Sequence, residues 1–249
     1  MRGGSDLFDH VGVSVSDRAA SRRFYDTVLA PLGHRLTHHT DHFDEWEDFG
    51  IAQADAARPA TSGVHVAFVA GSRENVDAFW RTGVEAGYAS DGESGPRPVY
   101  HEAYYGAFLL DPDGNSVEAV HHGRRRRGPN VVDHLWIRVR DVGASRAFYA
   151  AVAPVLGLRM RDGREGRVHV EAADRSFTLL AGTPTANLHV AFPARDDATV
   201  AAFHAAALAA GYRDNGAPGE RPQYHAGYYA AFVLDPDGTN VEAVCHSRP

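Results

Sequence analysis

The chain has 249 residues, enough for one large or two ordinary domains, and its 44% hydrophobic and 23% charged residues are typical of a soluble globular protein. A formal net charge of −7 gives no general attraction to nucleic acid, and the sequence contains no lysine, which excludes lysine Schiff-base chemistry. A single cysteine, Cys245, excludes an internal disulfide, and no apolar run approaches the roughly 18 residues of a membrane span, so we expect a cytoplasmic protein.

The first predicted element is a strand over residues 8–15, because Val11, Val13 and Val15 alternate with His10 and other residues on the opposite face. Asp17 is suited to cap a helix that reaches about Leu32. Short strands then follow to about Gln53. This order of one strand, one helix and several strands is the first structural module.

The same order begins again with a strand predicted over residues 63–69, followed by a helix from Asn75 to Gly87. Two more strands follow and are joined at Asp111-Pro112-Asp113-Gly114, where proline at the second position and glycine at the fourth favour a type I turn. The first half of the chain therefore contains two modules of similar organisation.

The second half repeats the first with a constant shift of 124 positions, which separates His10 from His134, His65 from His189 and Glu118 from Glu242. This repeat predicts one domain over residues 1–122 and another over residues 131–249. Between them, residues 123–130 include four consecutive arginines and are predicted to be a solvated linker rather than a nucleic-acid site. The whole chain is then a series of four modules.

Strand alternation places a polar set of side chains in each half on the face opposite the apolar residues. Two histidines and one glutamate per half can surround one side of a divalent metal ion and leave the other side open, the arrangement associated with Fe(II). We expect two metal centres, one per half, formed by the following residues: His10, His65 and Glu118 in the first, and His134, His189 and Glu242 in the second.

The modules, the two ligand sets and the Asp-Pro-Asp-Gly endings before Glu118 and Glu242 resemble the vicinal oxygen chelate (VOC) superfamily, over nearly the whole chain. This superfamily includes glyoxalase I, extradiol dioxygenases, fosfomycin-resistance transferases and metal-free bleomycin-binding proteins. The resemblance implies an α+β fold with four βαβββ modules forming two curled mixed-sheet domains and helices on the outer faces. It also implies a small organic substrate that binds a metal through two neighbouring oxygens.

The resemblance favours a dioxygenase-type metalloenzyme containing up to two ions, with Fe(II) first and Mn(II), Zn(II) or Ni(II) as alternatives. A glyoxalase-type site has a fourth, acidic ligand on the last strand of the first module, but this chain has Gln53 and Ala181 there. The extradiol pattern has a tyrosine where this chain has Phe108 and Phe232, although the nearby residues Tyr104, Tyr105, Tyr228 and Tyr229 are alternative sources of a hydroxyl. A glyoxalase-like isomerase or lyase, and a drug- or metabolite-binding protein without turnover, are the alternatives. The sequence also leaves a homodimer open.

Further candidates lie in matching positions of the two halves. His101 and His225, with the hydroxyls of Tyr105 and Tyr229, are expected to be catalytic, as general acids or bases, although a surface histidine bonded to the backbone is the alternative for each. Arg97 and Arg221 are expected to bind a substrate carboxylate, or else to form structural salt bridges. Trp136 and Arg138 follow His134 on one strand face, where the first half has the smaller residues Gly12 and Ser14. This larger, cationic lining predicts a different or smaller substrate in the second half, or else one of the two sites has become structural.

Overall fold

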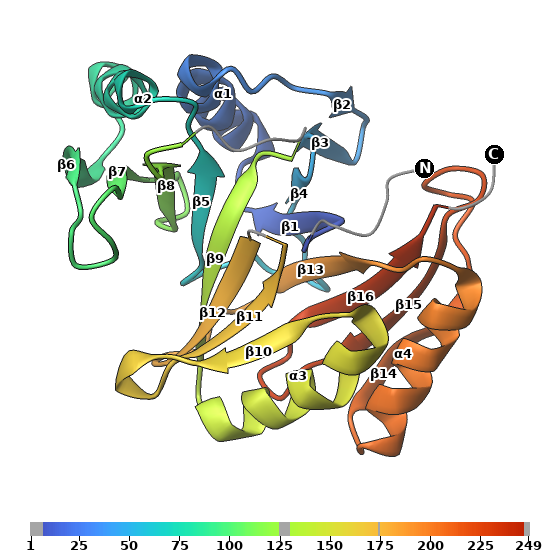
Figure 1. Cartoon of the computed structure of the whole chain (residues 1–249). Helices are drawn as coiled ribbons and strands as arrows, with labels where there is room; N and C mark the ends of the chain where they lie inside the picture. The colour runs from blue at the N-terminus through green and yellow to red at the C-terminus, as the bar shows by residue number, and fades with distance from the viewer. Residues whose placement is uncertain (1–6, 125–129, 174, 247–249) are drawn as a thin grey trace. The chain divides into compact units, whose positions relative to one another are not determined.

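The computed structural model describes residues 7–124, 130–173 and 175–246, and in this part of the chain the elements form four βαβββ modules (Figure 1). The first module consists of β1 (His10–Val15), α1 (Arg18–Leu29), the 3-10 turn η1 (Ala30–Leu32), β2 (His38–His39), β3 (Phe43–Trp46) and β4 (Phe49–Gln53). The second consists of β5 (His65–Val69), α2 (Arg73–Glu85), β6 (Ser90–Pro96), β7 (Tyr105–Leu110) and β8 (Ser116–His121).

The second half follows the same order. Its first module consists of β9 (Val132–Val139), α3 (Val142–Leu156), β10 (Arg159–Asp162), the 3-10 turn η2 (Arg164–Gly166), β11 (Val168–Ala172) and β12 (Arg175–Ala181). The fourth module consists of β13 (Leu188–Pro193), α4 (Asp197–Ala209), β14 (Arg213–Glu220), β15 (Tyr229–Leu234) and β16 (Asn240–Cys245). The α+β class and the modules expected from the sequence are therefore confirmed.

Local sequence signals explain where these elements begin and end. The side chain of Asp17 accepts a hydrogen bond from the backbone of Ala20 and caps α1, as predicted. The predicted extension to Leu32 is the 3-10 turn η1, which ends at Gly33 in the left-handed conformation (φ 86°). In the turn between β7 and β8, the backbone N–H of Gly114 donates to the carbonyl of Asp111 over 2.9 Å.

In the described residues, the strands form two mixed sheets of eight strands each. One has the order β14-β15-β16-β13-β1-β4-β3-β2, and the other has the order β10-β11-β12-β9-β5-β8-β7-β6. The first sheet thus combines the fourth module with the first, and the second combines the third module with the second. The parallel pairs include β13 with β16 in the first sheet and β5 with β8 in the second.

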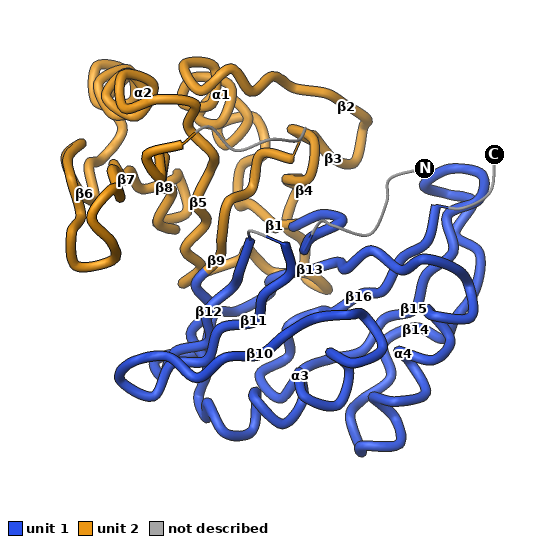
Figure 2. The backbone as a smooth tube through the Cα atoms, in the orientation of Figure 1, with its two compact units in different colours: residues 1–11, 136–249 blue, residues 12–135 orange. Residues whose placement is uncertain are grey.

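The chain forms two compact units that do not coincide with the sequence repeats (Figure 2). Unit 1 comprises Met1–Val11 and Trp136–Pro249, and unit 2 comprises Gly12–Leu135. Strands β1 and β9 are each divided between the units, so that His10 belongs to unit 1 and His134 to unit 2. The linker expected from the sequence covers residues 123–130, of which residues 125–129 lie outside the described residues.

The helices cover the apolar faces of the strands and leave the opposite faces to the polar residues. In β1 the exposure alternates, with Val11, Val13 and Val15 buried and His10 half-buried. In α2, a Cβ atom at Gly83 would lie 2.3 Å from Cδ1 of Leu109, so only glycine permits β7 to lie this close to the helix. Because Leu109 faces α2, its neighbour Phe108 faces the other side of the sheet, where Glu118 also lies. Within the described residues, no helix has the length and apolar character needed to cross a bilayer.

Candidate metal centres

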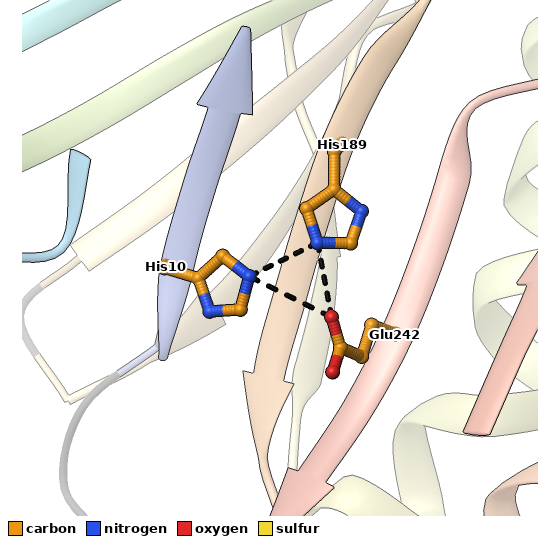
Figure 3. A group of neighbouring side chains, drawn as sticks. All are labelled: His10, His189 and Glu242. Atoms are coloured by element: carbon orange, nitrogen blue, oxygen red, sulfur yellow. Dashed lines mark hydrogen bonds and ion pairs between the residues drawn. The ribbon is translucent and has the colours of Figure 1, made fainter. Parts of the chain in front are cut away.

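In unit 1, three strands bring His10, His189 and Glu242 together (Figure 3). The Nε2 atoms of His10 and His189 are 3.0 Å apart. Oε2 of Glu242 lies 3.0 Å from Nε2 of His189 and 3.6 Å from Nε2 of His10. The side chains come from β1, β13 and β16, and Figure 3 shows that they point toward one another. Three potential ligand atoms therefore converge on one point.

Unit 2 contains the equivalent group, formed by His65, Glu118 and His134. Oε2 of Glu118 lies 3.0 Å from Nε2 of His65 and 3.5 Å from Nε2 of His134. These residues belong to β5, β8 and β9, and each is less than a tenth exposed. The group in unit 2 is thus more deeply buried than the group in unit 1, in which both histidines are about one fifth exposed (23% and 22%).

The six candidate ligands are those expected from the sequence, but their grouping differs from the expectation. His65 and Glu118 come together as predicted, and so do His189 and Glu242, because each pair belongs to one module whose first and last strands are parallel neighbours. The third member of each group comes from the other half of the sequence: His10 of β1 joins His189 and Glu242, and His134 of β9 joins His65 and Glu118. The predicted set of His10, His65 and Glu118 is therefore corrected: His134 takes the place of His10 beside Glu118, and His10 completes the group of Glu242.

The spacing of the donor atoms fits a divalent metal ion. When ligands lie about 2.1 Å from an ion and meet at right angles, neighbouring ligand atoms are about 3.0 Å apart. In unit 1 the three separations are 3.0, 3.0 and 3.6 Å, close to one face of an octahedron. Two imidazoles and one carboxylate also suit Fe(II), Mn(II) and other divalent ions. The residues present therefore fit a metal held by three protein atoms on one side.

Hydrogen bonds keep the carboxylates ionised despite their burial. Burial by itself would raise the pKa of Glu118, but hydrogen bonds with His134 and His65 outweigh it and lower the pKa to about 2. Glu242 follows the same pattern, and its pKa is lowered chiefly by His189 and His10 against the effect of burial. For His134, burial lowers the pKa, but Asp133 and Glu118 outweigh this effect and raise it to about 9. Each carboxylate is therefore available as a negatively charged ligand.

A buried tyrosine orients each glutamate. The hydroxyl of Tyr104 donates to Oε1 of Glu118 over 2.7 Å, and Tyr228 donates to Oε1 of Glu242 over the same distance. The other carboxylate oxygen, Oε2, is thereby directed toward the histidines. Burial, reinforced by the neighbouring carboxylate, raises the pKa of both tyrosines far above the usual value, so they remain hydrogen-bond donors.

Tyr105, which the sequence suggested as a catalytic residue, contacts helix α2. Tyr105 is the first residue of β7 and shares the face of Leu109, which packs on α2. Its hydroxyl donates to Asp77 of α2 over 2.8 Å. Tyr229 occupies the same position at the start of β15. The tyrosines that contact the glutamates are the residues one position earlier, which precede the strands, where alternation could not define their direction.

Replacing Tyr104 by phenylalanine should destabilise the metal-free protein by about 2 kcal/mol, because a buried, ionised carboxylate loses a hydrogen-bond donor. Tyr105→Phe is the matched control, with an expected loss below about 1 kcal/mol, because its hydroxyl bond to Asp77 is only partly buried. Urea unfolding followed by circular dichroism measures both changes. Equal stability of the two variants would contradict the assigned role of Tyr104.

The remaining candidates lie farther from the donor atoms. His101 is exposed, and its Nε2 atom lies 2.8 Å from Nδ1 of His122, while Nε2 of His225 lies 2.9 Å from Nδ1 of His246. His101 is linked to the ligand set by hydrogen bonds through His122 and Asp133. The residues that link His101 and His225 to the candidate ligands were not expected from the sequence. They nevertheless obey the 124-residue repeat, which relates Asp9 to Asp133 and His122 to His246.

The candidate substrate arginines are held against aromatic rings. The guanidinium carbon of Arg97 lies 5.4 Å from the ring centroid of Phe108, and that of Arg221 lies 5.5 Å from Phe232. Their terminal nitrogens donate to backbone carbonyls, including Glu93 for Arg97 and Ala217 for Arg221. The Phe108 ring is in turn 5.9 Å from the ring of His65. One aromatic ring therefore separates each arginine from a candidate ligand.

Trp136 and Arg138 both occupy half-buried positions of β9, alternating with buried neighbours as predicted. They lie two and four residues after His134 and thus share its face of the strand. The guanidinium carbon of Arg167 lies 5.3 Å from the centroid of the Trp136 ring. The corresponding positions of β1, Gly12 and Ser14, carry much smaller side chains, so the polar face of β9 is the bulkier and more cationic of the two.

Comparison with known proteins places these features in a family context. The model of the Glyoxalase/Bleomycin resistance protein/Dioxygenase superfamily matches residues 7–119 and 131–243. Among solved structures, glyoxalase I from Zea mays is similar with 20% identity and a TM-score of 0.69, covering 97% of this chain and 92% of that chain. A presumed dioxygenase from Bacillus subtilis is similar with 13% identity and a TM-score of 0.64, covering 98% of this chain and 86% of that chain. At these identities the likeness extends to the fold alone. No curated protein matches the chain.

Proposed function

Because the chain belongs to the glyoxalase/bleomycin resistance protein/dioxygenase superfamily, we propose that it is a metal-dependent enzyme with one centre in each unit. The substrate is a small organic molecule that binds the metal through two neighbouring oxygen atoms. The reaction we favour is dioxygenation, with Fe(II) as the metal. A glyoxalase-like isomerase or lyase reaction is the second candidate, since glyoxalase I from Zea mays has a similar fold over 97% of the chain.

The observation that carries this proposal is the duplicated set of two histidines and one glutamate with donor atoms spaced for one face of a metal ion. These residues would hold a divalent ion, which when bound would supply Lewis-acid polarisation of substrate oxygens and, as Fe(II), redox chemistry with dioxygen. The chain's own residues hold the face in place: Tyr104 and Tyr228 fix the glutamates, and the strands fix the histidines. Three protein donors leave room for two substrate oxygens.

The environment of Gln53 supports a three-donor centre over the four-donor centre of glyoxalase I. Its side-chain amide donates to the carbonyls of Val15 and Ser16, and its Oε1 atom accepts from the backbone of Arg18 at the start of α1. This amide therefore joins β4 to the start of the helix and is not available as a ligand. The equivalent Ala181 has no donor atom in its side chain.

The arginines beside the centres supply a basis for substrate binding. Arg97 and Arg221 are half-buried and held in position by backbone carbonyls, so little conformational entropy would be lost when they bind an anion. A carboxylate on the substrate is the group that a guanidinium prefers. Trp136 and Arg138 on β9 occupy more space than Gly12 and Ser14 on β1, so we expect a different or smaller substrate beside β9.

Oxygen uptake by the protein reconstituted anaerobically with Fe(II) tests this function, with catechols as substrates. We expect uptake by the wild type and its loss, by more than about 100-fold, in the double variant His65→Ala/His189→Ala, which removes one donor from each centre. His42→Ala, at an exposed position outside both centres, is the matched control and should retain the wild-type rate.

The other outcomes identify the alternatives. Formation of lactoylglutathione without oxygen uptake would assign the chain to the glyoxalase-like reaction. A purified protein that binds no stoichiometric metal would instead favour a binding protein without turnover and would contradict the proposed function.

A further inference from the structure

A carboxylate lies directly behind the first-strand histidine of each centre. Nδ1 of His134 lies 2.8 Å from Oδ1 of Asp133, and Nδ1 of His10 lies 2.9 Å from Oδ1 of Asp9. Since a carboxylate only accepts, each Nδ1 must carry the proton. The Nε2 atom, which faces the other ligands, then has its lone pair available for a metal when the ring is neutral. The carboxylate thus selects the tautomer that can bind an ion.

A pair of histidines lies behind each carboxylate. In unit 2, Nε2 of His122 lies 3.1 Å from Oδ1 of Asp133, and Nδ1 of the same ring is 2.8 Å from Nε2 of His101. In unit 1, Nε2 of His246 lies 3.0 Å from Oδ2 of Asp9, and its Nδ1 is 2.9 Å from Nε2 of His225. The chain of hydrogen bonds reaches from a candidate ligand to an exposed histidine in both units.

The two chains share their geometry as well as their composition. The paired rings are stacked with centroids 5.1 Å apart and planes at 21° in both units. The ring of Tyr104 meets the ring of His122 edge to face, and the ring of Tyr228 meets that of His246 in the same way. These are the tyrosines whose hydroxyls orient the glutamates. The same four residue types therefore form the same chain of hydrogen bonds in both units.

The outer histidine of unit 1 is also held by the backbone. Nδ1 of His225 lies 2.8 Å from the carbonyl oxygen of Ala226, and its Nε2 atom faces Nδ1 of His246. Both ring nitrogens of each histidine in this pair therefore have a hydrogen-bond partner, so the pair has a fixed position behind Asp9.

We propose that His122 with His101, and His246 with His225, are positioning residues that hold Asp133 and Asp9 against the metal-binding histidines and thereby set the affinity of each centre for its ion. This inference rests on the proposed metal centres. Removing a residue that forms a hydrogen bond with a metal ligand, without itself touching the metal, typically weakens metal affinity by about 10- to 100-fold. His101 and His225, expected from the sequence to be acids or bases, act here through other residues.

The test measures Co(II) affinity by calorimetry, together with the visible spectrum of the bound ion. A Glu242→Ala background restricts binding to the centre of unit 2. In this background His122→Leu should weaken binding by about 10- to 100-fold and alter the Co(II) spectrum. His122→Gln should restore most of the affinity, because its amide nitrogen can donate to Asp133 from the place of Nε2. His42→Ala should match the background protein.

A surface variant keeps the test valid if His122→Leu folds poorly. His101→Ala removes only the exposed end of the chain of hydrogen bonds and should weaken Co(II) binding by about two- to tenfold. Unchanged Co(II) affinity in folded His122→Leu or in His101→Ala would overturn the inference, although the metal centre itself would stand. A His122→Gln variant that binds Co(II) as weakly as His122→Leu would also overturn it. If the background protein binds no Co(II) at all, the proposed metal centre fails instead.

Discussion

Replacing His10 and Glu118 together by alanine should remove both metal equivalents from the chain, whereas replacing His10 and Glu242 together should remove one. The reason is the grouping of the ligands: His10 and Glu242 belong to the same centre, and Glu118 belongs to the other. The first double variant leaves two donors in each centre. The second leaves one centre with a single donor and the other centre intact.

This pair of variants distinguishes the observed grouping from grouping within each half of the sequence. If His10, His65 and Glu118 formed one centre, the two results would be reversed. Metal content after anaerobic loading with Fe(II) or Mn(II) and extensive dialysis, measured by mass spectrometry, gives the answer directly. His134→Ala/Glu118→Ala is a second matched variant and should lose one equivalent, because both residues belong to the centre of unit 2. Circular dichroism verifies that each variant is folded.

The grouping shows what a repeated sequence can and cannot specify. Alternation of apolar and polar residues identified the face on which His10, His65 and Glu118 lie, because the buried face of a strand must be apolar. It could not identify which modules share a sheet, because all four modules present the same apolar pattern. The first module joins the fourth in one sheet, and the second joins the third in the other. The ligands were therefore predictable one by one, but their partners across the sheet were not.

The residues around the ligands were harder to predict for local reasons. Tyr104 precedes β7 and His122 follows β8, so neither lies in a segment where alternation fixes the direction of a side chain. Asp133 lies within β9 and is 1% exposed, on the face opposite His134 by simple alternation, yet its carboxylate bonds to the neighbouring ring. The signal that was present in the sequence is the repeat itself, which pairs Asp9 with Asp133.

Metal binding by the centre of unit 2 should strengthen by about tenfold for each unit of pH up to about pH 9. In the metal-free protein, Asp133 and Glu118 raise the pKa of His134 to about 9 against the effect of burial, so this ring is protonated on both nitrogens at neutral pH. An ion needs the lone pair of Nε2 and must displace that proton, while the proton on Nδ1 stays with Asp133. Between pH 8 and pH 6 the affinity should therefore fall by about 100-fold.

The stability of the metal-free protein should change with pH in the opposite direction. A histidine whose folded pKa is raised stabilises the fold fully below its unfolded value, near 6.5, and this contribution is lost as the pH rises through about 9. Raising the pH thus decreases the stability of the metal-free fold at this site while it increases the affinity for the ion.

Calorimetric titration of the Glu242→Ala protein with Mn(II), in buffers of different ionisation enthalpy, should show about one proton released per ion at pH 7. Affinity that stays constant from pH 6 to pH 8 would show that the ion displaces no proton from His134, and would contradict this prediction.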